Sequence, residues 1–306
     1  MPTRSTLARL QQFLTALLVA VALGWLGWHW TDSPLRAVTG VMLIFAGHAF
    51  VLAAEFIALH LIGATDPADA TPRPTVSELV KAWAGETLMA PRVFCWRQPF
   101  RWRAIPDHLE EPQLKGRRGV VFVHGFVCNR GFWMPWLREM KACGHAFAAV
   151  NLEPVFGSID AYVPLIDDAV MRVTAATGLP PVLVCHSMGG LAARAWLQAH
   201  DAGHRVAHVV TLGTPHRGTW LARFSHVTNG RQMRIRSPFL LQLERARQGA
   251  PAVPFTCWYS NCDNIVFPVT TATLPGADNR LVRGVAHVDL AFEPQVMQAT
   301  FALLRS

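Results

Sequence analysis

The chain opens with two long apolar runs that are separated by a short polar turn. The first, Leu10–Trp30, contains no charged side chain, and a helix of this length, rising about 1.5 Å per residue, crosses a hydrocarbon core of about 30 Å. The second, Ala37–Ile62, follows the helix-breaking turn Thr31–Pro34. The pattern predicts a transmembrane helical hairpin over residues 1–63. A cleaved signal peptide is the alternative for the first run, but a second spanning run follows at once and no small-residue cleavage site is clear.

The second apolar run contains two polar side chains on one helical face. His48 and Glu55 are seven residues apart, which corresponds to about two helical turns. Polar groups in lipid usually face a partner helix rather than the acyl chains. We interpret these residues as helix-packing groups rather than as a proton relay, because two such residues do not make a pathway.

A stretch rich in proline and small polar residues follows the hairpin. It covers residues 64–78, and we predict a linker over residues 64–91 that separates the hairpin from a second domain. The next segment, Arg92–Arg103, is dense in arginine and aromatic residues, and two short strands joined at Gln98–Pro99 would accommodate it. Such a segment fits either a contact with lipid headgroups or an ordinary solvated edge hairpin.

Beyond this segment, short apolar runs alternate with stretches of helical periodicity. The alternation predicts an α/β fold with a doubly wound, mostly parallel sheet, in a domain that spans residues 92–306. The expected strands are Gly119–His124, His145–Val150, Val182–His186, Val206–Leu212, Phe255–Tyr259 and Arg280–Arg283. The expected helices are Trp133–Cys143, one that ends near Ala176, Met188–Ala199 and Pro294–Leu304.

The strand Val182–His186 leads directly into a serine, a methionine and two glycines before the next helix. A nucleophilic serine is displayed on such a strained strand-to-helix turn in many hydrolases, and its neighbours must be small because the backbone crowds them. Gly189 occupies the position of the second glycine of the usual G-x-S-x-G pattern, while Cys185, which is also small, replaces the first. The stretch predicts a nucleophile elbow at Ser187. The alternative is a buried strand that ends in an ordinary Ser-Gly turn.

A serine nucleophile requires a base that accepts its proton and a carboxylate that orients the base. After a nucleophile elbow these partners follow along the chain as Asp or Glu and then His. Asp263 lies in a polar turn after the strand Phe255–Tyr259, and His287 lies between the last strand and the final helix. We therefore expect Ser187, Asp263 and His287 to form a catalytic triad.

Other residues are candidates for the two partner roles. Asp278 and Asp289 are alternative acids, although the first lies in a Pro-Gly turn and the second follows the histidine too closely. His186 and His216 are alternative bases. The side chain of His186 should, however, point to the face of the strand opposite to that of the adjoining serine.

A tetrahedral intermediate needs two backbone N–H donors for its oxyanion, one from the residue after the nucleophile and one from an early loop. Met188 follows the serine and provides the first donor. The loop His124-Gly125-Phe126 comes straight after its strand and can provide the second donor through the N–H group of Phe126. We predict an oxyanion hole made by Phe126 and Met188.

Several of these motifs resemble those of bacterial lipases of the α/β-hydrolase superfamily. They are His124-Gly125-Phe126, Cys185–Gly190, Gly213–Gly218, Asp263 and His287. The resemblance covers about residues 117–306, excludes the hairpin, and implies a serine hydrolase with the triad and oxyanion hole described above. Some relatives bind calcium through an aspartate two residues after the histidine, where Asp289 stands here. No second ligand is identifiable, so we predict neither a metal nor an organic cofactor.

The formal net charge of +8, to which arginine contributes far more than lysine, suits an anionic partner. No zinc-finger spacing, helix-turn-helix signature or aromatic-basic RNA motif accompanies it, so we expect lipid rather than nucleic acid. Residues 217–247 are also rich in arginine and apolar side chains. We expect them either to form a lid over the site at an anionic lipid surface or to be a plain crossover helix.

The sequence thus predicts a membrane-anchored serine ester hydrolase of lipase or esterase type, which acts on lipid or another acyl ester through an acyl-enzyme. A thioesterase or acyltransferase with the same triad is the enzymatic alternative, and a catalytically silent membrane scaffold is the alternative from another class. Arg4 and Arg9 precede the first apolar run, and Arg73 and Lys81 follow the second. The positive-inside rule therefore places the catalytic domain on the cytoplasmic side of the inner (plasma) membrane. The oligomeric state is left open.

Overall fold

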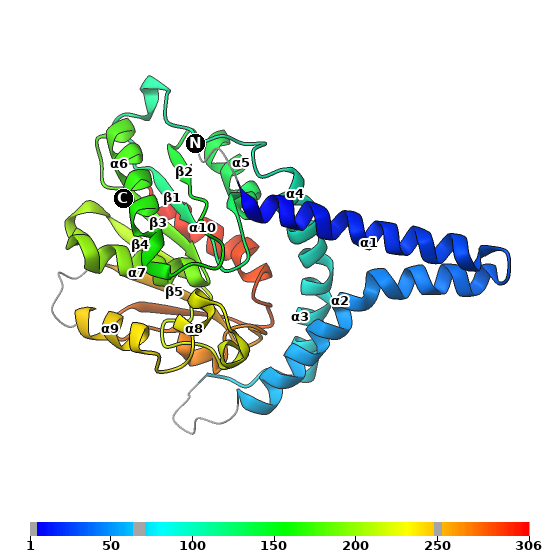
Figure 1. Ribbon diagram of the computed structural model, residues 1–306. Helices are drawn as coiled ribbons and strands as arrows, with labels where there is room; N and C mark the ends of the chain where they lie inside the picture. The colour runs from blue at the N-terminus through cyan, green and yellow to red at the C-terminus, as the bar shows by residue number, and fades with distance from the viewer. Residues whose placement is uncertain (1–4, 64–70, 248–252, 306) are drawn as a thin grey trace.

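Figure 1 shows the two parts of the chain, an α/β domain around one sheet and a long helical hairpin that projects from one side of it. The computed structural model describes residues 5–63, 71–247 and 253–305. The first residues of the predicted linker, 64–70, lie outside the described residues.

The two apolar runs form helices α1 (Thr6–Trp30) and α2 (Pro34–Ile62). Ser5 caps the first and Ser33 the second, and Pro34 occupies the start of α2, where the missing N–H has no intrahelical partner to lose. Both helices are long and apolar enough to cross a membrane. Only 11% of the most apolar stretch of α1, and 6% of that of α2, is buried. An exposed apolar surface of this extent marks a site of contact with lipid or protein. These features agree with the predicted hairpin.

The second half of the predicted linker, 64–91, is a helix instead. Helix α3 (Val76–Pro91) begins with a capping box in which Thr75 Oγ1 accepts the N–H of Glu78 and the Glu78 side chain accepts the N–H of Thr75. The Thr-x-x-Glu spacing is a helix start signal, and the prolines before it had suggested a continuous linker. The helix packs against α2 and so continues the helical part of the chain.

Most of the segment Arg92–Arg103 is helical, where two short strands joined at Gln98–Pro99 were predicted, and residues 101–103 form a turn. Helix α3 continues into a short π-helix, η1 (Arg92–Arg97), and then into α4 (Gln98–Phe100). Gln98 is fully buried, and its Oε1 accepts a hydrogen bond of 3.2 Å from Gln11 of α1. The β-branched and aromatic residues favour a strand locally, but packing against α1 and a helix already begun upstream override that preference.

The domain is built on six strands, all parallel, in the order β2-β1-β3-β4-β5-β6. This confirms the doubly wound parallel sheet that the alternation of runs predicts. The strands are β1 (Val120–Val123), β2 (Phe147–Ala149), β3 (Val182–His186), β4 (His208–Leu212), β5 (Phe255–Ser260) and β6 (Asp278–Val282).

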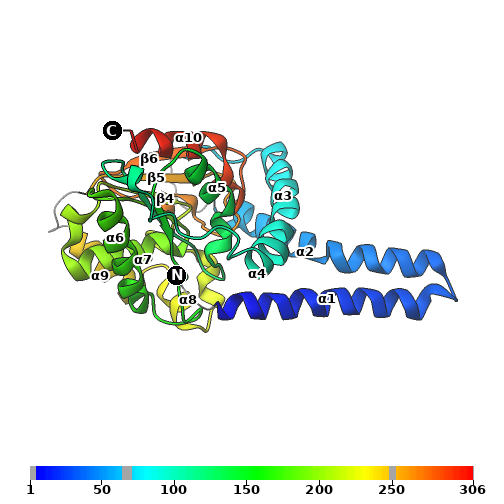
Figure 2. The ribbon, with the colours of Figure 1, turned by 90° about the horizontal axis from the view of Figure 1, so that it is seen from above.

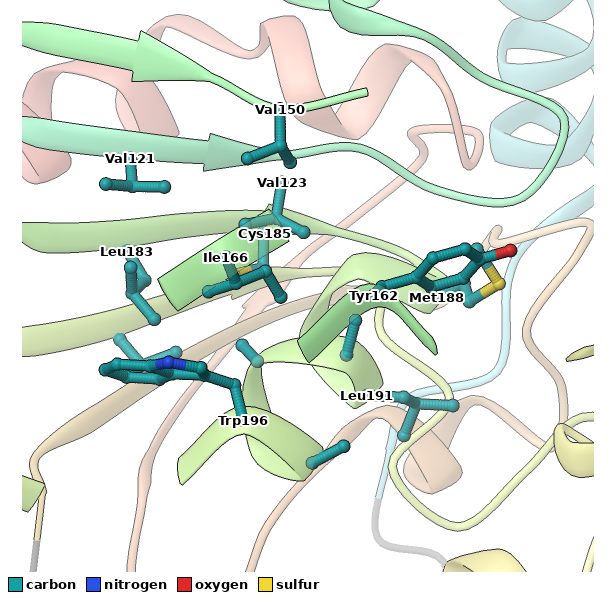
Figure 3. Packing of buried hydrophobic residues seen from close by; sticks show 14 of the residues in the cluster. Val121, Val123, Val150, Tyr162, Ile166, Leu183, Cys185, Met188, Leu191 and Trp196 are labelled. Atoms are coloured by element: carbon teal, nitrogen blue, oxygen red, sulfur yellow. The ribbon is translucent and has the colours of Figure 1, made fainter. Parts of the chain in front are cut away.

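Both faces of the sheet are covered, because successive side chains of each strand point to opposite faces. Val121 and Val123 of β1 belong to the core beneath α6 and α7, which Figure 3 shows, whereas Val120 and Phe122 belong to the core beneath α5 and α10. Figure 2 shows these pairs of helices on the two sides of the sheet. The helices are α5 (Met134–Ala142), α6 (Val163–Thr177), α7 (Met188–His200) and α10 (Pro294–Leu303).

A third apolar cluster joins the N-terminal helices to the loops that follow β5 and β6. Phe56 and Leu59 of α2 and Ala82 of α3 pack with Phe267 and Ala286. The last turns of α2 are therefore part of the α/β domain rather than a free tether. The hairpin emerges from the carboxyl edge of the sheet, since the strands end at these loops.

Helix α3 also places a buried carboxyl group, that of Glu86, under the loop after β6. The side chain is 2% exposed and accepts the backbone N–H groups of Val288 at 3.2 Å and Asp289 at 3.3 Å. Burial, and after it the charge of Asp289, raise the pKa of Glu86 to about 8. Burial raises the pKa of Asp289 to about 6.

The raised pKa of Glu86 predicts that the stability of the folded protein falls as the pH rises. Because its pKa is raised, Glu86 keeps a proton in the folded state that it loses in the unfolded chain near the ordinary pKa of 4.5. Its contribution to the free energy of unfolding is therefore full below that pH and is lost as the pH passes about 8. We expect the melting temperature in detergent micelles to decrease between about pH 5 and pH 8. Glu86→Gln should flatten this slope, leaving the smaller component from Asp289.

Glu78→Gln, on the same helix, is the matched control. The hydrogen bond from Arg283 lowers the pKa of Glu78 to about 2, so its contribution is present above the ordinary pKa and is lost only as the pH falls towards 2. The slope between about pH 5 and pH 8 should therefore be that of the unmodified chain. A Glu86→Gln curve parallel to the wild-type curve would contradict the assignment.

Candidate active site

The turn between β3 and α7 has the strained conformation of a nucleophile elbow. Ser187 lies between the last residue of the strand and the first of the helix, with φ 53° and ψ −126°. A non-glycine residue with positive φ is disfavoured sterically and persists only where the surrounding structure imposes it. Here Thr214 Oγ1 donates to the Ser187 carbonyl at 2.8 Å, and the Ser187 N–H donates to Leu212 at 2.9 Å.

The small residues around the elbow are required by close contacts. A Cβ atom on Gly189 would lie 2.3 Å from the carbonyl oxygen of Val123, and one on Gly190 would lie 2.3 Å from Oγ1 of Thr214. Cys185, which replaces the usual first glycine, points into the core under α7 and is fully buried (Figure 3). The sheet therefore accommodates its side chain away from the serine.

The predicted acid and base are joined by a buried hydrogen bond. Asp263 Oδ2 lies 2.9 Å from Nδ1 of His287, and the two residues are 1% and 4% exposed. The other carboxylate oxygen, Oδ1, accepts the N–H groups of Ile265 at 3.0 Å and Val266 at 2.7 Å. The Asp263 side chain is thus fixed from two sides, and it in turn orients the imidazole.

The alternative acids have other partners. Asp278 lies at the exposed start of β6 and forms an ion pair of 2.7 Å with Arg280. Asp289 lies beside α3, where a Cβ atom on Gly85 would be 2.5 Å from its Oδ2. Of the three aspartates, the structure brings Asp263 to the histidine.

The alternative bases are also engaged elsewhere. His186 stacks on Phe132, with ring centroids 4.4 Å apart, and its Nε2 donates to the backbone oxygen of His287 at 3.2 Å. Burial lowers the pKa of His186 well below its ordinary value, so the ring is neutral. His216 lies with its Nε2 3.1 Å from Thr211 Oγ1. The ring of His287 lies 4.7 Å from that of His186, the residue that directly precedes Ser187.

The two predicted oxyanion donors flank the serine. Met188 is the first residue of α7, and the N–H groups of a first helical turn have no acceptor within the helix. Phe126 follows Gly125, where an added Cβ atom would be 2.8 Å from the Cβ atom of Ser187. The loop of Phe126 therefore lies directly against Ser187.

A buried histidine fixes the conformation of this loop. His124 Nε2 accepts the N–H of Leu152 at 3.0 Å, so its Nδ1 carries the proton and donates to the Gly125 carbonyl at 2.9 Å. Burial lowers the pKa of His124 to about 4, which keeps the ring neutral and in one tautomer. The hydrogen bond holds the Gly125 carbonyl and therefore the peptide unit that carries the N–H group of Phe126.

The arginine-rich segment 217–247 forms short helices between β4 and β5 rather than one crossover helix. They are η6 (Trp220–Phe224), α8 (Thr228–Gln232) and α9 (Pro238–Arg247). Asn229 Nδ2 donates to Val155 at 2.8 Å and so ties α8 to the loop after β2. Phe224 is 62% exposed. A lid role for this segment stays a prediction.

Two residues that the sequence reading did not single out support the site. Asn264 Oδ1 accepts the backbone N–H of His287 at 3.2 Å, and Thr214 holds the Ser187 carbonyl. Asn264 follows the predicted acid directly, but asparagine is common in polar turns, so no local signal distinguishes it. Within the part of the chain that the structure describes, no grouping of three or more His, Cys, Asp or Glu residues could hold a metal ion.

Comparison with known proteins agrees with the fold of the α/β domain. A lipase of Bacillus licheniformis, BlEst2 in its mature form, superposes with a TM-score of 0.57 at 19% identity, over 65% of this chain and 96% of that one. Lipase B of Aspergillus fumigatus superposes with a TM-score of 0.55 at 16% identity, over 67% of this chain and 57% of that one. At such identities the likeness shows the fold. The sequence profile of the alpha/beta hydrolase family matches residues 120–299, more than half of the 306 residues, and the chain belongs to that family.

Proposed function

We propose that this protein is a membrane-anchored serine ester hydrolase of lipase or esterase type. The observation that carries the proposal is the buried Asp263–His287 hydrogen bond at the edge of the sheet where the strained Ser187 turn lies. A serine hydroxyl, a carboxylate and an imidazole, in this order along the chain, are the parts of an acyl-transfer site. The superposable lipases support an ester or lipid as the substrate class.

In the proposed reaction, Ser187 Oγ attacks the acyl carbonyl while His287 Nε2 accepts the hydroxyl proton. The oxyanion is stabilised by the N–H groups of Phe126 and Met188. Collapse breaks the ester C–O bond, and the imidazolium returns its proton to the leaving alkoxide, which gives an alcohol and an acyl-enzyme. Water then attacks the acyl carbon and loses a proton to His287. As the bond from this carbon to Ser187 Oγ breaks, the imidazolium returns the proton to Oγ, which gives the carboxylic acid and the free serine. Asp263 holds the imidazole in the required tautomer throughout.

In this proposal the hairpin anchors the protein in a bilayer. Its helices leave large apolar side chains exposed, among them Phe13 at 63%, Met42 at 67% and Trp28 at 79%. The arginine-rich segment 92–103, which follows α3, also has exposed aromatic side chains, Trp96 at 57% and Phe100 at 48%. Aromatic and cationic side chains together suit the interface of an anionic leaflet. A substrate drawn from the bilayer would then reach the carboxyl edge of the sheet.

Substitution of the triad tests the catalytic assignment. Ser187→Ala, Asp263→Asn and His287→Ala should each lower kcat by about a thousandfold or more, and a double variant should lose little beyond a single one, because the three act as a unit. The measurement is hydrolysis of p-nitrophenyl esters of increasing acyl length by the full chain in detergent. Asp278→Asn, an exposed carboxylate on β6, is the control and should keep full activity.

A fluorophosphonate probe separates the enzyme from the silent scaffold. The wild-type chain should be labelled at Ser187, and Ser187→Ala should not. A folded, unlabelled wild-type chain would favour the scaffold, while near-normal turnover in Asp263→Asn would move the acid to Asp289 or Asp278. Transfer of the acyl group to an added alcohol in preference to water would indicate an acyltransferase, and preference for thioesters a thioesterase.

The topology is tested by reporter fusions at two points. The basic residues Arg4 and Arg9 before α1 predict a cytoplasmic amino terminus, and two spans return the chain to the same side. Green fluorescent protein fused after Ser306 should fluoresce, and alkaline phosphatase at that point should be inactive. Phosphatase inserted in the α1–α2 turn should be active. The reverse result at both points would overturn the cytoplasmic assignment.

A further inference from the structure

The hairpin helix α2 contains an acidic side chain, Glu55, that reaches the α/β domain. A carboxylate within an apolar helix is retained at low free-energy cost only when a polar group satisfies it. Glu55 is half-buried, and its Oε2 accepts a hydrogen bond of 2.7 Å from Nδ2 of Asn264. The two residues are 209 positions apart, so this contact exists only because α2 packs on the loop after β5.

Asn264 connects this carboxylate to the base of the proposed triad. It is fully buried and follows Asp263 directly. While its Nδ2 donates to Glu55, its Oδ1 accepts the backbone N–H of His287 at 3.2 Å. One amide side chain therefore joins the anchor helix, the loop of the acid and the loop of the base.

The chemistry of the carboxylate selects the orientation of the amide. The Oε2 atom of Glu55 is the acceptor of this hydrogen bond, so it favours the conformer in which the NH₂ group of Asn264 faces Glu55. The carbonyl oxygen of Asn264 must then face the N–H of His287. The opposite conformer would place two hydrogen-bond donors, NH₂ and N–H, against each other in a buried site, which is unfavourable.

We propose that Glu55 is a positioning residue for the active site, acting through Asn264 to hold His287 in register with Asp263. This inference rests on the proposed function, since it assumes that His287 is the base. The neighbouring backbone is held from the other side, where Glu86 of α3 accepts the N–H groups of Val288 and Asp289. A catalytic imidazole needs placement to within about 0.5 Å, so release of one of these supports should slow turnover.

The test compares Glu55→Leu with Glu55→Gln in the full chain in detergent. Leucine removes the acceptor, and we expect kcat to fall by about 10- to 100-fold with KM within about threefold, because no substrate contact changes. Glutamine retains an acceptor oxygen and should keep activity within about threefold of wild type. Ile57→Ala, which alters an exposed position two residues further along α2, is the matched control and should change neither parameter.

A second background separates positioning from general destabilisation. In His287→Ala, residual turnover no longer depends on the imidazole, so adding Glu55→Leu should lower it no further. Asn264→Ala should reproduce the loss of Glu55→Leu, and the double variant should equal either single one. Asn264→Ala also provides the measurement if Glu55→Leu does not fold.

The outcomes distinguish this inference from the proposed function. Wild-type kcat in Glu55→Leu, together with an inactive His287→Ala, would overturn the positioning role and leave the triad intact. An equal loss on adding Glu55→Leu to His287→Ala would also overturn it, because the effect would then be independent of the base. Full activity in His287→Ala would instead overturn the proposed function itself.

Discussion

The hydrogen bond between Asp263 and His287 depends on the parallel arrangement of the sheet. The two residues follow β5 and β6, which are neighbouring strands, and Ser187 follows β3 two strands away. Parallel strands bring all their carboxyl ends to one edge, so residues from three separate loops can meet there. The bond is buried, which removes competition from water and makes the orientation of the imidazole well defined.

The loops that hold this pair are themselves supported from the N-terminal part of the chain. Glu55 of α2 reaches Asn264, Glu86 of α3 reaches the backbone after His287, and an apolar cluster including Phe56 and Phe267 fills the space between them. The hairpin and the α/β domain therefore share one packed interface. Cutting the chain at residue 63 would expose the apolar side chains of that interface.

The same packing sets where a bilayer would lie relative to the site. The hairpin projects from one side of the α/β domain (Figure 1), and its base packs on the loops that follow β5 and β6. Ser187 directly follows β3 and therefore lies at the same carboxyl edge of the sheet. The exposed Trp96 and Phe100 lie on the helical segment between hairpin and domain. Under the proposed function, a lipid-derived ester would enter the site from this side of the domain.

The sequence by itself determined the features that depend on residues close to one another along the chain. The length and apolarity of the two runs specify α1 and α2, the alternation of runs specifies the sheet, and the strand Val182–His186 is found with the bounds predicted for it. The small residues around Ser187 were sufficient to indicate a strained turn, because crowding there acts over a few residues. The segment Arg92–Arg103 was mispredicted because its helix depends on the buried contact of Gln98 with α1.

Only the tertiary structure decided which side chains meet. The sequence favours Asp263 over Asp278 and Asp289 by its place along the chain, and the hydrogen bond of Asp263 to His287, 24 positions away, exists only in the folded structure. The contact of Glu55 with Asn264 spans 209 positions, and no local pattern marks either residue as part of a site. The physical reason is that such contacts depend on which strand ends the sheet brings together and which helices pack on them, and these are properties of the whole chain.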